Sequence, residues 1–471
     1  MAQQTATTFG TGRSEAVYLT QDSSYGVVVD HAGTDAVPTD SECDLNVEFP
    51  RNPNNDKKET LSLSEVYDDG MYKTNFAMPD TDFKPSGAAA TAPDMAVAFK
   101  TLMGSQVAGV ADKPVVAASP VPAVGGCTVD DADHMEKGQP VRFEGNATAA
   151  IANKCRVLTS VDKVTKAVTW APPLTVAPAS TDTINLGFAW NQTTVNELSM
   201  SAFQEFVLLV QAASGISLNT GKFTIAGNGH VKFSCNGVGC GKFSFVGQGV
   251  TTGTTAIDAL TMAVAVGQGK RFRVTTDDPS LYIRVEDEII RVTSVSADTL
   301  TIVRAQKSSS AAEHLTASVI VPWRPTRTVV GAPIFTTSKL SETLLDGAAF
   351  RINQGAVDID NGFAERDPCV GDLFTYEAPH RTGMNPFKVK LALSGRLTKD
   401  NLHIFGGAMS ATTHTFFAAV GNAASKFFVC YIPKWKPNIK NPKGAEDEMM
   451  FDHEGECMET VGLDVVYFGQ V

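Results

Sequence analysis

The sequence has few charged residues, no excess of basic ones and few cysteines. Asp, Glu, Lys and Arg together make up 19% of its 471 residues, below the usual share of about 25%. The 51 acidic residues outnumber the 39 basic ones and give a formal net charge of −12. This charge argues against a protein that binds nucleic acid through phosphate contacts. Hydrophobic residues make up 43%, which excludes an intrinsically disordered chain.

The eight cysteines are spread thinly along the chain, a pattern typical of free thiols in a reducing cytosol. Cys235 and Cys240 are the closest pair, and without a second pair they do not predict a zinc ribbon. Residues 1–6 have no basic end followed by an apolar stretch, so we expect no secretory signal there. Residues 107–124 are the most apolar window, but charged residues and prolines interrupt them. We therefore expect no membrane span.

Motifs that would indicate catalysis are missing. The glycine-rich residues 227–229 and 237–242 are followed by strand patterns and not by helices, so they predict hairpin turns and not phosphate loops. The sequence has no Gly-x-Ser-x-Gly and no His-Glu-x-x-His motif. Residues 453–457 are interpreted as a solvated acidic loop, and the carboxylates of 286–288 and 358–360 as structural or interface charges. We therefore predict no catalytic residue, no cofactor and no metal site, and no enzyme.

The dominant hydrophobic pattern has period two. In residues 43–49, Leu45, Val47 and Phe49 alternate with polar residues, which places them on one face of a strand. Similar short runs recur to the end of the chain, with turn residues between them. The pattern predicts a mostly β protein built from antiparallel sandwiches or barrels. The expected turns include Gly227-Asn228-Gly229, Asn236-Gly237, Gly247-Gln248-Gly249 and Asn361-Gly362.

Few segments predict helices. Residues 93–104 begin with Pro and Asp and end with Gly, as a helix does. Residues 201–213 fit a helix or a buried strand, and their flanking sequence favours a strand. A further short helix is expected around residues 399–405.

A resemblance appears in the last third of the chain. Residues 350–368 resemble the strand and turn of tail tube (major tail) proteins of long-tailed bacteriophages, and later segments match that family in order. The similarity extends to residues 222–247, where a hairpin of Val231-Lys232-Phe233 against Phe243-Ser244-Phe245 is expected, and to the amino-terminal strands. Residues 266–325 are similar to small β modules of phage tail proteins. The later matching segments are residues 388–397, 398–401, 427–435 and 461–470.

The resemblance implies a tail-tube-type antiparallel β-sandwich or barrel whose sheets join edge to edge around a ring, with rings stacked into a hollow tube. Its partners would be copies of itself, the tape measure, tail terminator and tail tip proteins, and DNA that passes without tight binding. The protein would be made in the host cytoplasm and act in the virion tail. A carbohydrate-binding or adhesive β protein on a virion or cell surface is the alternative, and a β-rich glycan hydrolase is a third.

Length predicts the domain organisation. One tube domain needs roughly 150 residues, so we expect two tandem tube-like domains, the first from residues 1–126 with 188–265 and the second from 326–471. Residues 127–187 and 266–325 would be inserted β modules that decorate the outside of the tube. Three such chains would form a ring of pseudo-sixfold symmetry, and a hexamer of single enlarged subunits is the alternative. An acidic lumen wall would let DNA slide.

Two adjacent charge blocks near the carboxyl terminus are candidate oligomer contacts. Basic residues precede acidic ones, and blocks of opposite sign can dock subunit to subunit or ring to ring. A solvated loop is the alternative. The candidate interface residues are Lys434, Lys436, Lys440, Glu446, Asp447 and Glu448.

Overall fold

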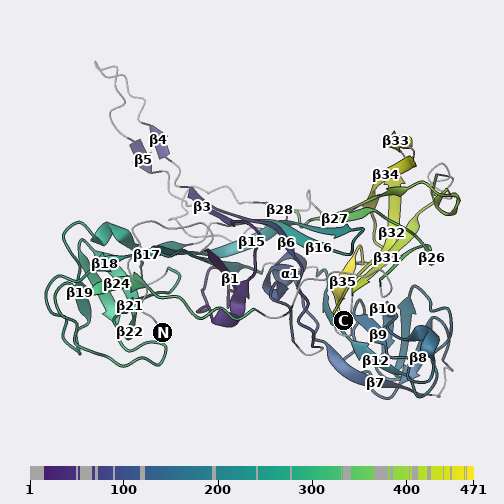
Figure 1. Cartoon of the computed structure of the whole chain (residues 1–471), viewed down its shortest axis with the longest axis horizontal. Helices are drawn as coiled ribbons and strands as arrows, with labels where there is room; N and C mark the ends of the chain where they lie inside the picture. The colour runs from purple at the N-terminus through teal and green to yellow at the C-terminus, as the bar shows by residue number, and fades with distance from the viewer. Residues whose placement is uncertain are drawn as a thin grey trace.

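The protein is mostly β, as the sequence predicts, and is elongated, with several antiparallel sheets along its length (Figure 1). The sheets form because alternating side chains give each strand one apolar face to bury. The computed structural model describes residues 15–48, 51–53, 66–68, 73–88, 91–116, 122–193, 198–239, 242–275, 278–329, 331, 341–364, 380–381, 386–402, 404–405, 412–421, 426–438, 440–445, 448–460, 462 and 464–471.

Eight strands of the amino-terminal half, here called the first strand set, are linked by seven antiparallel pairings. These are β1–β2, β1–β14, β3–β6, β6–β16, β14–β15, β15–β16 and β15–β17. The strands are β1 (Ala16–Gln21), β2 (Ala36–Val37), β3 (Asp44–Glu48), β6 (Lys73–Asp82), β14 (Met200–Glu205), β15 (Leu209–Ala226), β16 (Val231–Gly239) and β17 (Phe243–Gly247).

The second strand set repeats these seven pairings in the same chain order. They are β25–β26, β25–β31, β27–β30, β30–β34, β31–β32, β32–β34 and β32–β35. A short strand, β33, adds to β34. The strands are β25 (Glu342–Leu345), β26 (Ala348–Ala349), β27 (Gln354–Asp360), β30 (Lys388–Arg396), β31 (His414–Gly421), β32 (Phe427–Asn438), β33 (Lys443–Ala445), β34 (Glu448–Cys457) and β35 (Tyr467–Gln470).

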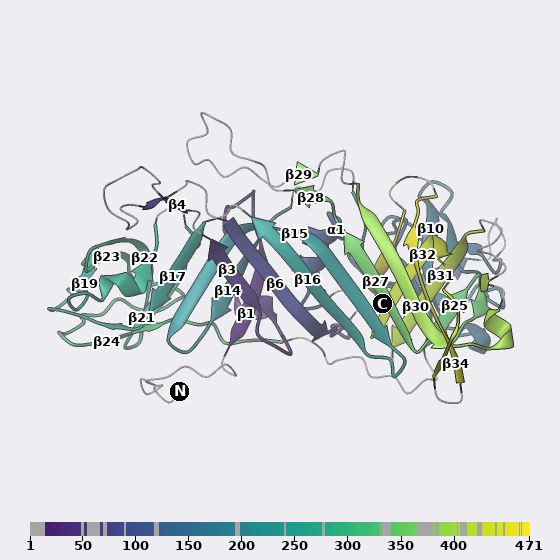
Figure 2. The ribbon, with the colours of Figure 1, turned by 90° about the horizontal axis from the view of Figure 1, so that it is seen from above.

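The two sets join into one sheet because β15 pairs with β27. Figure 2 shows β3, β6, β16, β15, β27 and β30 side by side along the long axis of the molecule. β13 (Phe188–Trp190), which precedes β14 in the chain, pairs with β35 of the second set. Strands of both sets therefore bury side chains in one continuous core.

The helix α1 (Ala96–Met103) packs in that core against β15 and lies within the 93–104 segment where a helix was expected. Phe99 is fully buried among the aromatic rings of Trp190, Phe223 and Phe233. A Cβ on Gly221 of β15 would lie 2.3 Å from a Leu102 methyl carbon, so glycine there permits the close approach of the helix. Gly104 ends the helix in the left-handed conformation, at φ 100°.

A closed six-stranded barrel occupies the segment between α1 and β13. The barrel starts at residue 110, earlier than the predicted module of residues 127–187, because β7 completes the ring by pairing with both β8 and β12. It has its own apolar core. Its strands are β7 (Val110–Val116), β8 (Gly126–Val129), β9 (Pro140–Phe143), β10 (Cys155–Asp162), β11 (Ala167–Ala171) and β12 (Thr183–Leu186).

The barrel docks on the second strand set, although it is inserted within the first. Cys155 and Val157 of β10 pack with Phe417, Phe427 and Tyr431. The buried Arg156 guanidinium lies 2.9 Å from a carboxylate oxygen of Glu342 and stacks over the Phe417 ring.

A second module follows the first strand set and shares its core. Tyr18 and Val246 of the first set pack in one cluster with Met262 and Ile283 of the module. The module therefore packs against the sheet through this shared core. Its strands are β18 (Gly249–Val250), β19 (Thr261–Ala263), β21 (Leu281–Val285), β22 (Glu288–Ser296), β23 (Thr299–Val303) and β24 (Val319–Pro322).

The remaining elements are short. β20 pairs with β17, and two small ribbons form from β4 with β5 and from β28 with β29. The bounds are β4 (Arg51–Pro53), β5 (Val66–Asp68), β20 (Phe272–Arg273), β28 (Phe363–Ala364), β29 (His380–Arg381), and the 3₁₀ turns η2 (Gly33–Asp35), η3 (Ala149–Ile151), η4 (Gly269–Arg271) and η5 (Lys399–Asn401).

Several local predictions can be compared with these elements. Residues 201–213 form strands, as favoured, and Gly227-Asn228-Gly229 is a hairpin turn. Asn236-Gly237 was wrongly predicted as a turn, since it lies inside β16, which is paired on both edges. The predicted hairpin of Val231-Lys232-Phe233 with Phe243-Ser244-Phe245 is also wrong, because β16 and β17 each pair with β15 and not with each other.

Candidate functional site

Around β27 and β30, the joined sheet has one apolar side and one charged side. On β27 and β30, Val357, Ile359, Val389 and Leu391 are buried in the core. The residues between them point to the opposite side because neighbouring side chains in a strand alternate. We call this opposite side the charged face, and its residues are Thr220, Lys222, Asn236, Asp358, Asp360, Lys388, Lys390, Lys436, Glu454 and Glu456.

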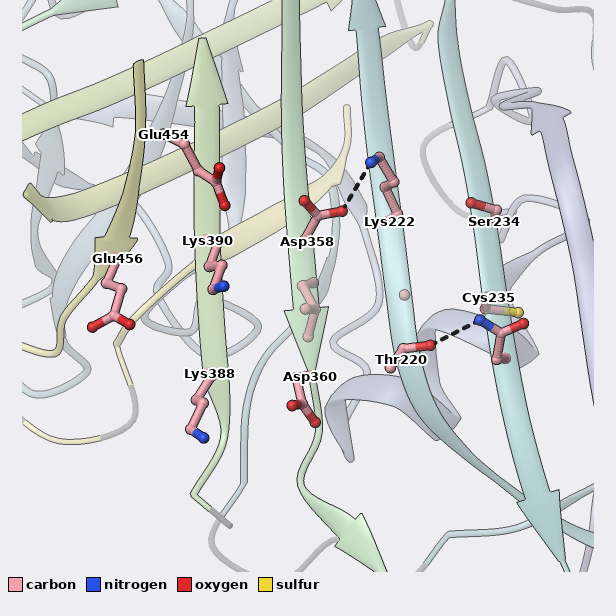
Figure 3. Close-up of a pocket in the computed structure, with 13 residues that line it drawn as sticks. Thr220, Lys222, Ser234, Cys235, Asp358, Asp360, Lys388, Lys390, Glu454 and Glu456 are labelled. Carbon is pink, nitrogen blue, oxygen red and sulfur yellow. Dashed lines mark hydrogen bonds and ion pairs between the residues drawn. The ribbon is translucent and has the colours of Figure 1, made fainter. Parts of the chain in front are cut away.

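Opposite charges alternate across five neighbouring strands of the charged face. Strand register places Lys222 opposite Asp358, Asp358 opposite Lys390, Lys390 opposite Glu456, and Glu456 opposite Lys436. The Lys222 ammonium lies 3.2 Å from an Asp358 carboxylate oxygen (Figure 3). Cross-strand pairs of opposite sign favour this register over a slipped one.

A neighbouring row of the charged face is more polar. The Asn236 side chain donates a hydrogen bond of 3.1 Å to the Thr220 hydroxyl, and Thr220 lies opposite Asp360, which lies opposite Lys388. Together the two rows line an open groove of about 630 Å³, seen in Figure 3. The groove is open and is lined by charges of both signs and by the buried Cys235, so it suits contact with a charged surface.

The ion pairs on the charged face are exposed. The Lys222 and Asp358 side chains are 47% and 44% accessible to solvent, so water and salt screen their attraction and the pair contributes about 0–1 kcal/mol. The alternation therefore matters mainly for what the face presents, because each charge has an opposite charge beside it. A partner that approaches meets no large area of one sign.

Those interface residues predicted from the sequence that the structure describes lie at one end of this sheet. Lys434 is half-buried and Lys436 exposed on β32, and the Lys440 ammonium lies 4.0 Å from a Glu454 carboxylate oxygen. Glu448 pairs with Arg396 at 2.8 Å, and Glu446 and Asp447 lie outside the described residues. Lys440 thus meets a carboxylate of β34 and Lys436 lies opposite Glu456 of β34, and the role of these residues at an interface stays a prediction.

The sheet ends in two edges that are unpaired within the described part of the chain. On one side β3 pairs only with β6, and it exposes Asp44, Asn46 and Glu48. On the other side, β32 beyond Trp435 pairs with β34 along one edge only. Unpaired backbone N–H and C=O groups at such edges bind a further strand readily.

The structure also describes two other acidic segments that the sequence singles out. Residues 286–288 lie at the hairpin between β21 and β22, and Glu288 is fully buried against Arg304 and His314. Residues 453–457 were wrongly interpreted as a solvated loop, since they belong to β34 and His453 is fully buried. Burial lowers the pKa of His453 and favours its neutral form.

The described residues contain no group of three or more His, Cys, Asp or Glu side chains that could hold a metal ion. In the same residues, no helix combines the length and apolar character needed to cross a membrane. Six cysteines in the described ranges are free thiols. No protein-family model matches the sequence, and no curated protein matches it.

Proposed function

We propose that this chain is a structural subunit that assembles edge to edge with copies of itself into rings, and that stacked rings form the hollow tail tube of a long-tailed bacteriophage. The observation that carries the proposal is the continuous sheet through β3, β6, β16, β15, β27, β30, β34 and β32, which ends in two edges unpaired among the described residues. Pairing those edges between copies gives their unpaired backbone N–H and C=O groups hydrogen-bond partners.

The repeated pairings support tandem tube-like domains. Seven strand pairings of the first strand set recur in the second, in the same order along the chain. In this proposal each set is one tube-like unit and three chains supply six units to a ring. The barrel and the second module cover the outer sides of the units, away from the charged face.

The charged face is the proposed lumen wall. The sequence predicted an acidic wall, whereas this face alternates acidic and basic residues. A DNA phosphate that approaches Lys222 or Lys390 also approaches Asp358, which lies between them. Such a wall offers no cluster of basic side chains for phosphate binding, so DNA could pass without tight binding. Tape measure, terminator and tip proteins are its further proposed partners in the virion tail, and no catalytic step or cofactor is proposed.

The alternative of a carbohydrate-binding or adhesive protein calls for clustered exposed aromatic residues. Trp170, Trp190 and Trp435 are buried, and Trp323 packs against Tyr282 with the Lys307 ammonium over its ring. Three of the four tryptophans are thus closed to a sugar ring, and Trp323 is half-buried, so the described tryptophans form no exposed cluster. The self-assembly proposal is therefore preferred.

Negative-stain imaging of the purified full chain, with mass per tube repeat, tests the proposal. We expect rings or hollow tubes with three copies per ring. A protein that stays monomeric at every concentration would contradict the proposed function. Six copies per ring with true sixfold symmetry would keep the tube and refute the tandem domains.

A further inference from the structure

One strand pairing has no counterpart in the repeated pattern. Along one edge of β15 lie β16 and then β17, and along its other edge lie β14 and β27. One edge of β32 pairs with β34 and β35, and the other edge pairs with β31. Within the described residues, no strand lies beside β32 in the position that β27 takes beside β15.

We propose that a second copy of this chain fills that place. The segment that begins with Asn438 at the end of β32 in one copy pairs with β3 of the next copy, in the register that β15 and β27 use within the chain. The proposal rests on the proposed function and deepens it, because it states which residues meet at the junction between subunits.

The register on β3 follows from its neighbour β6. Glu48 lies opposite Lys73, just as Asp360 lies opposite Lys388. With this alignment the sequences of β6 and β30 are similar. Residues 73–79 (KTNFAMP) and 388–394 (KVKLALS) share the lysine, two buried apolar positions and the alanine between them. Glu48 is therefore the counterpart of Asp360, and Asn46 that of Asp358.

The register on β32 follows from its neighbour β34. Thr220 lies opposite Asn236, and Asn438 lies opposite Glu454. The residue after each partner is a glycine, Gly237 or Gly455. A Cβ on Gly237 of β16 would lie 2.8 Å from an Ile216 side-chain carbon of β15. A Cβ on Gly455 of β34 would lie 2.0 Å from the Lys436 carbonyl oxygen of β32. Both strands therefore need glycine where the neighbouring strand comes close.

Asn438 is therefore the counterpart of Thr220, and Lys440 follows Asn438 by two residues as Lys222 follows Thr220. Within the chain, Thr220 faces Asp360 and Lys222 faces Asp358. Between copies, Asn438 then faces Glu48 of the second copy, and Lys440 faces Asn46 of the second copy.

Charge complementarity supports the same pairing. The β3 edge exposes Asp44 and Glu48, whereas Lys436 and Lys440 are exposed at the β32 edge. Edges of opposite sign attract each other, and two copies of the same edge repel, which disfavours a two-fold dimer. A head-to-tail junction uses a different edge on each copy and therefore builds closed rings or open filaments.

Disulfide cross-linking in assembled tubes tests the register. The variant with Glu48→Cys and Asn438→Cys places the two thiols directly opposite each other, where Cα atoms in an antiparallel pair lie about 4.5–5.5 Å apart and can be bridged. The matched control, Asp44→Cys with Asn438→Cys, shifts one thiol four residues along the same strand, about 13 Å away. After oxidation with copper phenanthroline and air, we expect cross-linked dimers and trimers for the first variant only, above the wild-type background.

The outcomes separate the inference from the proposed function. If wild-type protein forms tubes and the first variant cross-links no better than the control, the register is overturned and the tube stands. If wild-type protein forms neither rings nor tubes, the proposed function itself fails.

A second measurement covers the case in which the cysteine variants do not assemble. Asn46→Asp would recreate, between copies, the ion pair of Lys222 with Asp358. It should lower the critical concentration for assembly about 1.5- to 5-fold at low salt, and Asn46→Lys should raise it similarly. Equal critical concentrations for both variants would overturn the register.

Discussion

Replacing Glu288 by glutamine should strongly lower the stability of the second module. The Glu288 carboxylate is fully buried and accepts hydrogen bonds from Arg304 Nε at 2.7 Å and Nη2 at 2.6 Å, from the N–H groups of Ala305 and Ala312, and from His314 Nε2. Burial raises the pKa of Glu288, but these donors outweigh it and lower the pKa to about 2. Relative to an ordinary value of 4.5, that is about 3 kcal/mol in favour of the charged form.

Glu288→Gln removes the charge and turns one accepting oxygen into an NH₂ group that faces other donors. Breaking a buried pair by changing one partner costs about 3–5 kcal/mol, because the Arg304 charge stays buried. Hydrogen exchange over residues 281–303 should then lose roughly 10²- to 10⁴-fold in protection. The control is Glu286→Gln in the same hairpin, since Glu286 is 54% exposed and also contacts His314. It should cost less than about 1 kcal/mol.

The pH dependence has a definite sign. Because the folded pKa of Glu288 is lowered, its contribution is complete above about pH 4.5 and is lost as the pH falls towards 2. Glu288→Gln should remove this part of the acid sensitivity. Protection in Glu288→Gln within tenfold of wild type, or an effect as large in Glu286→Gln, would refute the reasoning.

Three further predictions concern other parts of the fold. Burial raises the pKa of Asp22, so ionisation of its carboxylate lowers the stability of the fold as the pH rises above about 3.8. Asp22→Asn should change the free energy of unfolding by less than about 1 kcal/mol and should weaken that pH dependence in thermal unfolding. Gly455→Ala should lower the melting temperature sharply because its Cβ would lie 2.0 Å from the Lys436 carbonyl oxygen, whereas Gly444→Ala, with open space around it, should not. Deleting residues 250–321 should increase dye binding and aggregation, because the module shares its core with the first strand set; a soluble variant with tubes intact would contradict this.

Much of the fold is local and could be predicted from the sequence. Alternation in residues 43–49 identified β3, and the Pro, Asp and Gly signals placed α1. Asn236-Gly237 misled the prediction because Asn-Gly favours turns, whereas here Gly237 serves a close approach to β15 that no local pattern reveals. The placement of β16 and β17 along one edge of β15 depends on long-range pairing in the same way.

The candidate site could not be predicted because its members are far apart in the sequence. Lys222, Asp358, Lys390 and Glu456 become neighbours only through the register of β15, β27, β30 and β34. Lys434, Lys436 and Lys440, the basic residues of the predicted interface, lie at one end of this sheet, and their role at an interface stays a prediction. Glu454 belongs to the acidic block that follows these lysines in the sequence, and it meets Lys440 within the same chain, across a hairpin.

The placement of the barrel has a consequence for synthesis of the chain. Its last strand ends at Leu186, and the surface on which it docks includes Phe427, about 240 residues later. At about 5–20 residues per second the ribosome needs roughly ten to fifty seconds to cover that distance. Arg156 lacks its partner Glu342 for about the first two thirds of this interval, and throughout it the docking side of the barrel is open to the second strand set of a neighbouring nascent chain. Exchange of barrels between copies made on one messenger RNA therefore competes with folding within each chain.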